Sequence, residues 1–186
     1  GFTKGSNPSV YFAGMMQYDG DRQIPPNYLV EPPAIDDTVG EQLEAAGLRT
    51  YAISETQKYG HVTFFFNGNR GDKPECETWE EIPSVNVPFN RRPAMSATEI
   101  TDRAVRAIES GEYDHVRINL ANGDMVGHTG DLQATIDAVA CVDSEVGRLI
   151  AAVDASGGIL LLTADHGNAD QMFNIDKKTG AYTPVP

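Results

Sequence analysis

Residues 158–163 read Gly-Ile-Leu-Leu-Leu-Thr, an apolar run with no polar alternation. Such a run is typical of a strand that is covered on both faces of a sheet. It follows a long segment, from about Asp131 to Asp154, in which apolar residues recur at helical spacing. A buried strand that follows a helix indicates a sheet with parallel strands.

The same alternation extends toward the amino terminus. Strands are predicted at residues 49–53, 62–66 and 115–120, which are rich in β-branched, aromatic or aliphatic residues. Helices are predicted at 36–46 and 96–111, the second beginning at Ser96-Ala97-Thr98-Glu99, a match to the capping box. The acidic residues and prolines of 71–93 predict an irregular loop. The expected fold class is α/β, with a mainly parallel sheet flanked by helices and right-handed crossovers.

Composition limits the class of protein. The apolar fraction of 40%, the charged fraction of 22% and the absence of repeats predict a globular domain. Residues 1–35 contain five prolines without helical or alternating periodicity, so we interpret them as a linker or interdomain arm, and residues 36–186 as the domain. The formal charge of −13 argues against nucleic acid and anionic membranes as partners.

No apolar run approaches the roughly 18 residues that a membrane span requires. The two cysteines, Cys76 and Cys141, lie far apart and outside any Cys-x-x-Cys spacing, so neither a disulfide framework nor a cysteine metal site is predicted. These features favour a protein of the reducing cytoplasm.

Two polar clusters follow predicted strands. Asn122-Gly123-Asp124-Met125-Val126-Gly127-His128 comes after the strand at 115–120, and Ala164-Asp165-His166-Gly167-Asn168 comes after the run at 158–163. Ligands gather beyond the carboxyl ends of strands in parallel sheets. Carboxylate and imidazole donors suit manganese, zinc or iron better than calcium or magnesium. The alternative is that each aspartate is only a helix cap or a turn residue.

The predicted donors favour two ions over one. Adjacent side chains on an extended backbone point in opposite directions, so Asp165 and His166 are awkward partners on one ion. Two ions roughly 3.5–4 Å apart can hold the attacking and leaving oxygens of a phosphoryl group. Lys58 and His61 lie between two predicted strands. From the residues alone, Lys58 is more readily a solvated surface lysine than a phosphate ligand, and His61 a hydrogen-bonding residue at a strand end.

Three motifs together resemble the cofactor-independent phosphoglycerate mutases. They are the residues 54–65 around Lys58, the residues 122–130 around Asp124 and the residues 163–170 around Asp165, and their order and separations also match. The resemblance extends from roughly Val10 to Asp170. It implies the carboxyl-terminal part of an alkaline-phosphatase-like domain, incomplete here, that interconverts 3-phosphoglycerate and 2-phosphoglycerate in glycolysis through a phosphoserine intermediate.

The resemblance also implies site residues and cofactors. Asp124 and His128 would ligate one divalent ion, Asp165 and His166 a second, and Lys58 would neutralise the transferring phosphoryl group. The ions implied are Mn²⁺, with Zn²⁺, Co²⁺ or Mg²⁺ as substitutes.

This chain also departs from the family pattern. The family's first strand with its aspartate ligand, its nucleophilic serine and its transferase domain have no counterpart here, and Tyr182 stands where the family has a third histidine. We therefore expect a fragment that is inactive alone. The alternatives are a related metal-dependent phosphatase or phosphopentomutase, or a non-catalytic binding module of the same fold.

Overall fold

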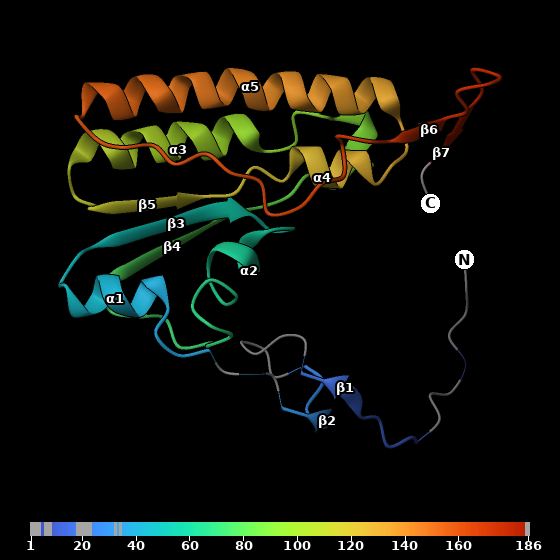
Figure 1. The fold of residues 1–186 in the computed structure, drawn as a ribbon. Helices are drawn as coiled ribbons and strands as arrows, with labels where there is room; N and C mark the ends of the chain where they lie inside the picture. Colours follow the sequence, from blue (N-terminus) through green and yellow to red (C-terminus); the bar gives the residue numbers. More distant parts are fainter. Residues whose placement is uncertain (1–4, 6–8, 18–23, 32, 34, 185–186) are drawn as a thin grey trace.

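The computed structural model describes residues 5, 9–17, 24–31, 33 and 35–184. Its centre is a three-stranded parallel sheet with the order β4-β3-β5 (Figure 1). The strands are β3 (Thr50–Glu55), β4 (Glu77–Ile82) and β5 (His115–Ile118). All six residues of β3 are buried, because a strand lies on each side of it and helices cover both faces. This confirms the predicted fold class, a mainly parallel sheet flanked by helices.

The helices form layers on the two faces of the sheet. Figure 1 shows α3 (Ala97–Ser110) and α5 (Leu132–Ala155) on one side, with α3 nearer the strands, and α1 (Val39–Ala45) and α2 (Tyr59–Val62) on the other. A 3₁₀ turn, η1 (Phe89–Arg91), precedes α3, and the short helix α4 (Asn122–Gly127) follows β5. None of the helices in the described ranges is long and apolar enough to cross a membrane.

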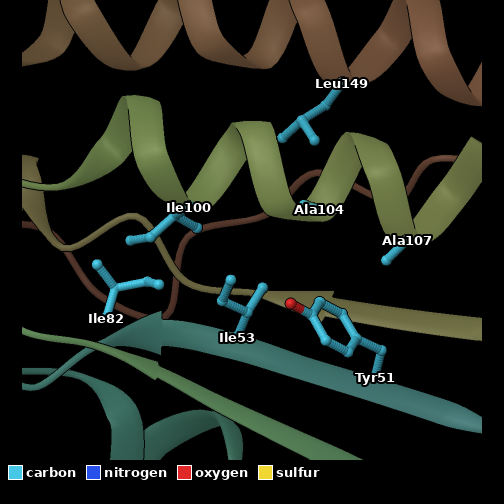
Figure 2. Close-up of a cluster of buried hydrophobic side chains, with 7 residues drawn as sticks. All are labelled: Tyr51, Ile53, Ile82, Ile100, Ala104, Ala107 and Leu149. Carbon is cyan, nitrogen blue, oxygen red and sulfur yellow. The ribbon is translucent and has the colours of Figure 1, made fainter.

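The main core lies between the sheet and α3. Figure 2 shows side chains of β3 pointing up toward α3, while Leu149 of α5 points down onto the same helix. Ile53, Ile100 and Ala104 are completely buried. Alanines on α3 leave room for the larger residues around them, as close packing requires. The cluster comprises Tyr51, Ile53, Ile82, Ile100, Ala104, Ala107 and Leu149.

Two small sheets flank this unit in the sequence. Strands β1 (Gly14–Met16) and β2 (Tyr28–Val30) pair in parallel, and β6 (Phe173–Ile175) and β7 (Tyr182–Pro184) form an antiparallel hairpin. The predicted arm at residues 1–35 thus contains two short strands in its described part. The domain boundary at residue 35 stays a prediction.

Two strand predictions and one loop prediction were wrong. Residues 62–66 end α2 and continue as turns, because Phe65 donates its backbone N–H to Gly60 and Asn67 donates to Thr63. The predicted acidic loop at 71–93 contains β4, whose Glu77 is buried against Arg117. The run at 158–163 forms no strand, and Ile159, Leu161 and Leu162 are 89%, 87% and 71% exposed. A strand needs a hydrogen-bonding neighbour, and this run has none among the described residues.

The predicted capping box was also wrong. Ser96 does precede α3, but its side chain makes no cap hydrogen bond and donates to the carbonyl oxygen of Pro83 instead, at 3.2 Å. The capping box of this chain lies at α1, where Thr38 accepts from the Glu41 backbone and Glu41 accepts from the Thr38 backbone. The predicted carboxyl end of α3 is confirmed, since Gly111 adopts the left-handed conformation there.

Candidate functional site

Three segments meet beyond the carboxyl ends of β3 and β5. Lys58 is the N-cap of α2, directly after β3. Asp124 lies in α4 and His128 is the C-cap of that helix. Asp165 and His166 belong to the loop after α5. The structure thus places three predicted site residues around Asp124, namely Lys58, His128 and His166. The fifth predicted residue, Asp165, lies beside His166.

Asp124 is the centre of the arrangement. Its Oδ2 lies 2.5 Å from Nζ of Lys58, and its Oδ1 lies 3.1 Å from Nε2 of His128. The pair with His128 follows from helical spacing, because residues four apart share a face of a helix. Nε2 of His166 lies 3.9 Å from the same Oδ1. One carboxylate therefore faces an ammonium group and two imidazoles.

Asp165 and His166 are more exposed than Asp124. Their side chains are 62% and 47% exposed, against 16% for Asp124. Oδ1 of Asp165 lies 3.8 Å from Nε2 of His166 and also accepts the backbone N–H of His166 at 3.1 Å. The two neighbouring side chains thus approach each other on the solvent side of the site.

The donor atoms fit divalent metal ions in kind. Carboxylate oxygen together with imidazole nitrogen is the donor set of manganese, zinc or cobalt sites. Among the described residues, however, no three His, Cys, Asp or Glu side chains are arranged to hold an ion. The pair Asp124 and His128 and the pair Asp165 and His166 each supply two donors, where a catalytic metal ion normally has at least three.

The electrostatics favour an ionised Asp124. Partial burial alone would raise the pKa of Asp124, but hydrogen bonds from Lys58 and Asn168 and the charges of Lys58 and His128 outweigh it and lower the pKa. His61 lies at the margin of the site. Burial and the nearby Lys58 lower the pKa of His61, although Asp165 and Asp124 act in the opposite direction. His61 belongs to α2, so its predicted position at a strand end was wrong.

A pocket of about 450 Å³ opens beside the site. Its polar lining includes Lys58, Asp124, Asp165 and His166, together with Asn119, Thr163, Asn168 and Asp170, and most of the remaining lining is apolar. The apolar walls come from β5, from α5 and from the segment 160–162. They comprise Val116, Ile118, Leu120, Val139, Val142, Val146, Leu149, Leu160, Leu161 and Leu162. A mostly apolar hollow with convergent polar groups at one end is the usual form of a ligand site.

Lys58 differs from the interpretation that the residues alone favoured. It is only 8% exposed and ion-paired, so it is not a solvated surface lysine. Gly123 and Gly127 have no left-handed backbone and lie within α4, where they allow the 165–170 loop to approach closely.

Sequence reasoning missed two polar residues next to the site. Glu55, at the end of β3, is completely buried and accepts from Oγ of Ser84 at 2.8 Å and from the Ser96 backbone N–H at 3.4 Å. Burial raises the pKa of Glu55 despite these two hydrogen bonds. Asn168 donates to Asp124 at 2.8 Å. Its position two residues after His166 was the available signal, whereas the contacts of Glu55 depend on loops distant in sequence.

A sequence profile described as the metalloenzyme superfamily matches residues 7–186. The chain belongs to this superfamily. It is 57% identical over 173 residues to the 2,3-bisphosphoglycerate-independent phosphoglycerate mutase of Trypanosoma brucei brucei, and 53% identical over 174 residues to that of Mesembryanthemum crystallinum. Each alignment covers 92% of this chain and 31% of the relative.

A solved structure shares the fold. A crystal structure of Leishmania mexicana phosphoglycerate mutase at low cobalt concentration matches with a TM-score of 0.88 and 48% identity. The match covers 99% of this chain and 36% of that one. The resemblance found in the sequence motifs is thereby confirmed, and the chain spans about a third of the length of the relatives it matches.

Proposed function

We propose that this chain is the metal-binding part of a cofactor-independent phosphoglycerate mutase, a cytoplasmic enzyme of glycolysis that interconverts 3-phosphoglycerate and 2-phosphoglycerate. The observation that carries the proposal is the convergence of Lys58, His128 and His166 on the single carboxylate of Asp124. The level of identity with the trypanosomal and plant mutases supports the same substrate.

Two divalent ions, Mn²⁺ in preference to Zn²⁺, Co²⁺ or Mg²⁺, belong to this proposal. Asp124 and His128 would hold one ion, and Asp165 and His166 the other. Bound ions of this kind stabilise the charge that develops on a transferring phosphoryl group and activate an oxygen nucleophile.

Lys58 is the phosphate-binding cation in this scheme. Its stem is buried and its ammonium group is held at the polar end of the pocket by Asp124. A lysine offers phosphate a compact point charge, and neutralising the phosphoryl oxygens favours their approach to a site that also contains carboxylates. The chain as a whole repels anions, so Lys58 together with the proposed divalent ions would admit a phosphorylated substrate.

We also propose that other segments of a longer polypeptide complete the site. Each pair of metal ligands lacks a third donor, and Tyr182, in the place of the family's third histidine, packs edge-to-face on Phe173 in the β6–β7 hairpin. A nucleophilic serine and a further aspartate would come from the missing segments. The 186-residue chain alone is therefore expected to be inactive.

The pocket supports a strand as one of these missing segments. β5 has a ladder partner on one edge only within the described part of the chain. The apolar run 159–162 is exposed across the pocket from β5. A strand inserted between them would satisfy the free backbone groups of β5 and bury the apolar walls. The transferase domain that grips the glycerate is the other proposed partner.

The decisive experiment uses the full-length natural polypeptide that contains these residues. Phosphorus NMR should show 3-phosphoglycerate converting to 2-phosphoglycerate with Mn²⁺, with loss of activity after EDTA and recovery on adding Mn²⁺ back. Release of inorganic phosphate without isomerisation would instead identify a phosphatase. Absence of both activities, together with absence of Mn²⁺ binding, would identify a non-catalytic binding module.

A further inference from the structure

Asn168 links the two halves of the site. Its Nδ2 donates to Oδ1 of Asp124 at 2.8 Å and to the backbone carbonyl oxygen of the same residue at 3.2 Å. Asn168 belongs to the loop that carries Asp165 and His166, whereas Asp124 belongs to α4. This side-chain amide therefore bridges two segments that are far apart in the sequence.

The surface of α4 is shaped to receive Asn168. A Cβ on Gly127 would lie 2.7 Å from Oδ1 of Asn168 and 3.1 Å from its Cγ. Gly123 lies one turn before Gly127 on the same helix, and a Cβ there would lie 4.0 Å from Cβ of Ala169. A side chain at position 127 would displace Asn168, because a 2.7 Å approach is closer than van der Waals contact allows. The loop thus packs on a helix face on which two glycines flank Asp124.

The amide also restricts the orientation of the carboxylate. Oδ1 of Asp124 accepts from Asn168 and faces Nε2 of His128 at 3.1 Å, while Oδ2 faces Lys58. With each oxygen engaged from a different side, rotation of the carboxylate would break contacts to two or more partners. Carboxylates that ligate metals are commonly oriented by hydrogen bonds of this kind.

We propose that Asn168 is a positioning residue that docks the loop of Asp165 and His166 onto α4 and fixes the carboxylate of Asp124. It acts through Asp124 and His166, so it is not itself a metal ligand or a catalytic residue. The docking of the loop and the orientation of the Asp124 carboxylate are inferred from the contacts that Asn168 makes with Asp124 and from its packing on Gly127. The effect on metal affinity rests in addition on the proposed function, because it assumes that Asp124 ligates an ion.

The first test is made on the metal-free 186-residue chain by ¹⁵N NMR of the histidine side chains. Asn168→Leu removes the donor at similar volume, and Gly127→Ala retains the donor but occupies its space. Both changes should shift the imidazole signals of His166 and also of His128. Asn86→Leu, at an exposed asparagine remote in sequence, should shift neither. Circular dichroism confirms that each variant keeps its helices.

The signal of His128 separates the two roles. If Asn168 only anchored the loop, the signal of His166 would move and that of His128, which belongs to α4, would not. Unchanged signals of both histidines in the two variants would overturn the proposal. Should Asn168→Leu fail to fold, Gly127→Ala alone decides, because it displaces Asn168 without removing any hydrogen-bonding group.

The second test titrates Co²⁺ and follows its visible absorption. If the unsubstituted chain binds Co²⁺, Asn168→Leu should weaken binding by about 10- to 100-fold, as the loss of an orienting partner does elsewhere. Equal affinity in the two proteins would contradict the positioning of Asp124. If the unsubstituted chain binds no Co²⁺, as the lack of a third donor in each pair allows, the imidazole signals alone decide the role of Asn168.

Discussion

The ammonium group of Lys58 lies 2.5 Å from Oδ2 of Asp124, joining the residue that follows β3 to the helix that follows β5. The two side chains are 10% and 16% exposed, so solvent screens their attraction only in part. The contact fixes the ammonium group at the polar end of the pocket, and hydrogen bonding from Lys58 contributes to the lowered pKa of Asp124.

Replacing Lys58 by methionine should therefore lower both stability and activity. The free energy of unfolding should fall by about 1–3 kcal/mol, because Asp124 loses a charged partner while it stays partly buried. In the full-length polypeptide, kcat should fall by about 100-fold or more, the usual effect of removing a group that stabilises transition-state charge. Urea unfolding and phosphorus NMR are the measurements. Lys177→Met, at an exposed lysine, serves as the control, and an equal effect there would contradict a specific role for Lys58.

Removing the carboxylate of Asp124 should abolish metal binding at its half of the site. Asp124→Asn should reduce the affinity for Mn²⁺ by at least about 100-fold, since a neutral amide replaces a charged ligand. Isothermal titration calorimetry measures the change. Asp143→Asn removes the same charge from an exposed position on α5 and should leave the affinity unaltered. Similar losses of affinity in both variants would mean that Mn²⁺ binding depends only on the overall charge of the chain.

The buried pair of Glu77 and Arg117 predicts a pH-dependent stability. Both carboxylate oxygens of Glu77 accept from Nη2 of Arg117 at 2.8 Å, and Asn67 donates to Glu77 at 3.0 Å. Burial alone would raise the pKa of Glu77, but hydrogen bonds from Arg117, Trp79 and Asn67 outweigh it, so the pKa lies below its ordinary value of 4.5. The stabilisation is therefore present above pH 4.5 and is lost as the pH falls through the folded-state pKa.

Glu77→Gln should lower the free energy of unfolding at pH 7 by about 3–5 kcal/mol, because it leaves the guanidinium of Arg117 buried without a counter-charge. The difference from the unsubstituted chain should shrink as the pH falls below 4.5 and through the lowered folded-state pKa, where Glu77 itself becomes neutral. Urea unfolding at a series of pH values tests both statements, with the exposed Glu112→Gln as control. A difference that stayed constant with pH would argue against the ion pair as its cause.

The apolar run 159–162 should make the isolated chain associate. Leu161 is 87% exposed, and exposed apolar surface next to a free strand edge favours contact with a second molecule. Leu161→Glu should shift sedimentation equilibrium toward the monomer. Leu29→Glu, at a leucine of β2 that is 71% exposed, is the matched control. If both changes act equally, exposed leucine in general, and not the edge of β5, drives association.

The parts of the fold that the sequence predicted well depend on local patterns. Apolar spacing placed α5 within a residue of its observed bounds, and Gly111 marked the end of α3. β4 was missed because Glu-Thr-Trp-Glu-Glu-Ile contains three acidic residues, and the burial of the first depends on Arg117, 40 residues later. The run at 158–163 was misread for the opposite reason: its composition favours a strand, but the described chain provides no neighbour to pair with.

The residues proposed for the site could be named from the sequence, but their contacts could not. Residue type and a position after a predicted strand pointed to Asp124, His128, Asp165 and His166, and resemblance to a family singled out Lys58. No local pattern could indicate that Lys58 is buried against Asp124, because that contact joins segments from different strands. The bridging position of Asn168 was hidden for the same reason.

Because β3 is the central strand, Lys58, which follows it, should be held more stably than the loop of Asp165 and His166. All six residues of β3 are buried, and it hydrogen-bonds to strands on both sides. Its amide protons should be among the last to exchange with solvent, which keeps Lys58 anchored through partial unfolding. The loop of Asp165 and His166 is mostly exposed and should detach first on mild denaturation. The chain would then lose the proposed metal ligands Asp165 and His166 before its core unfolds.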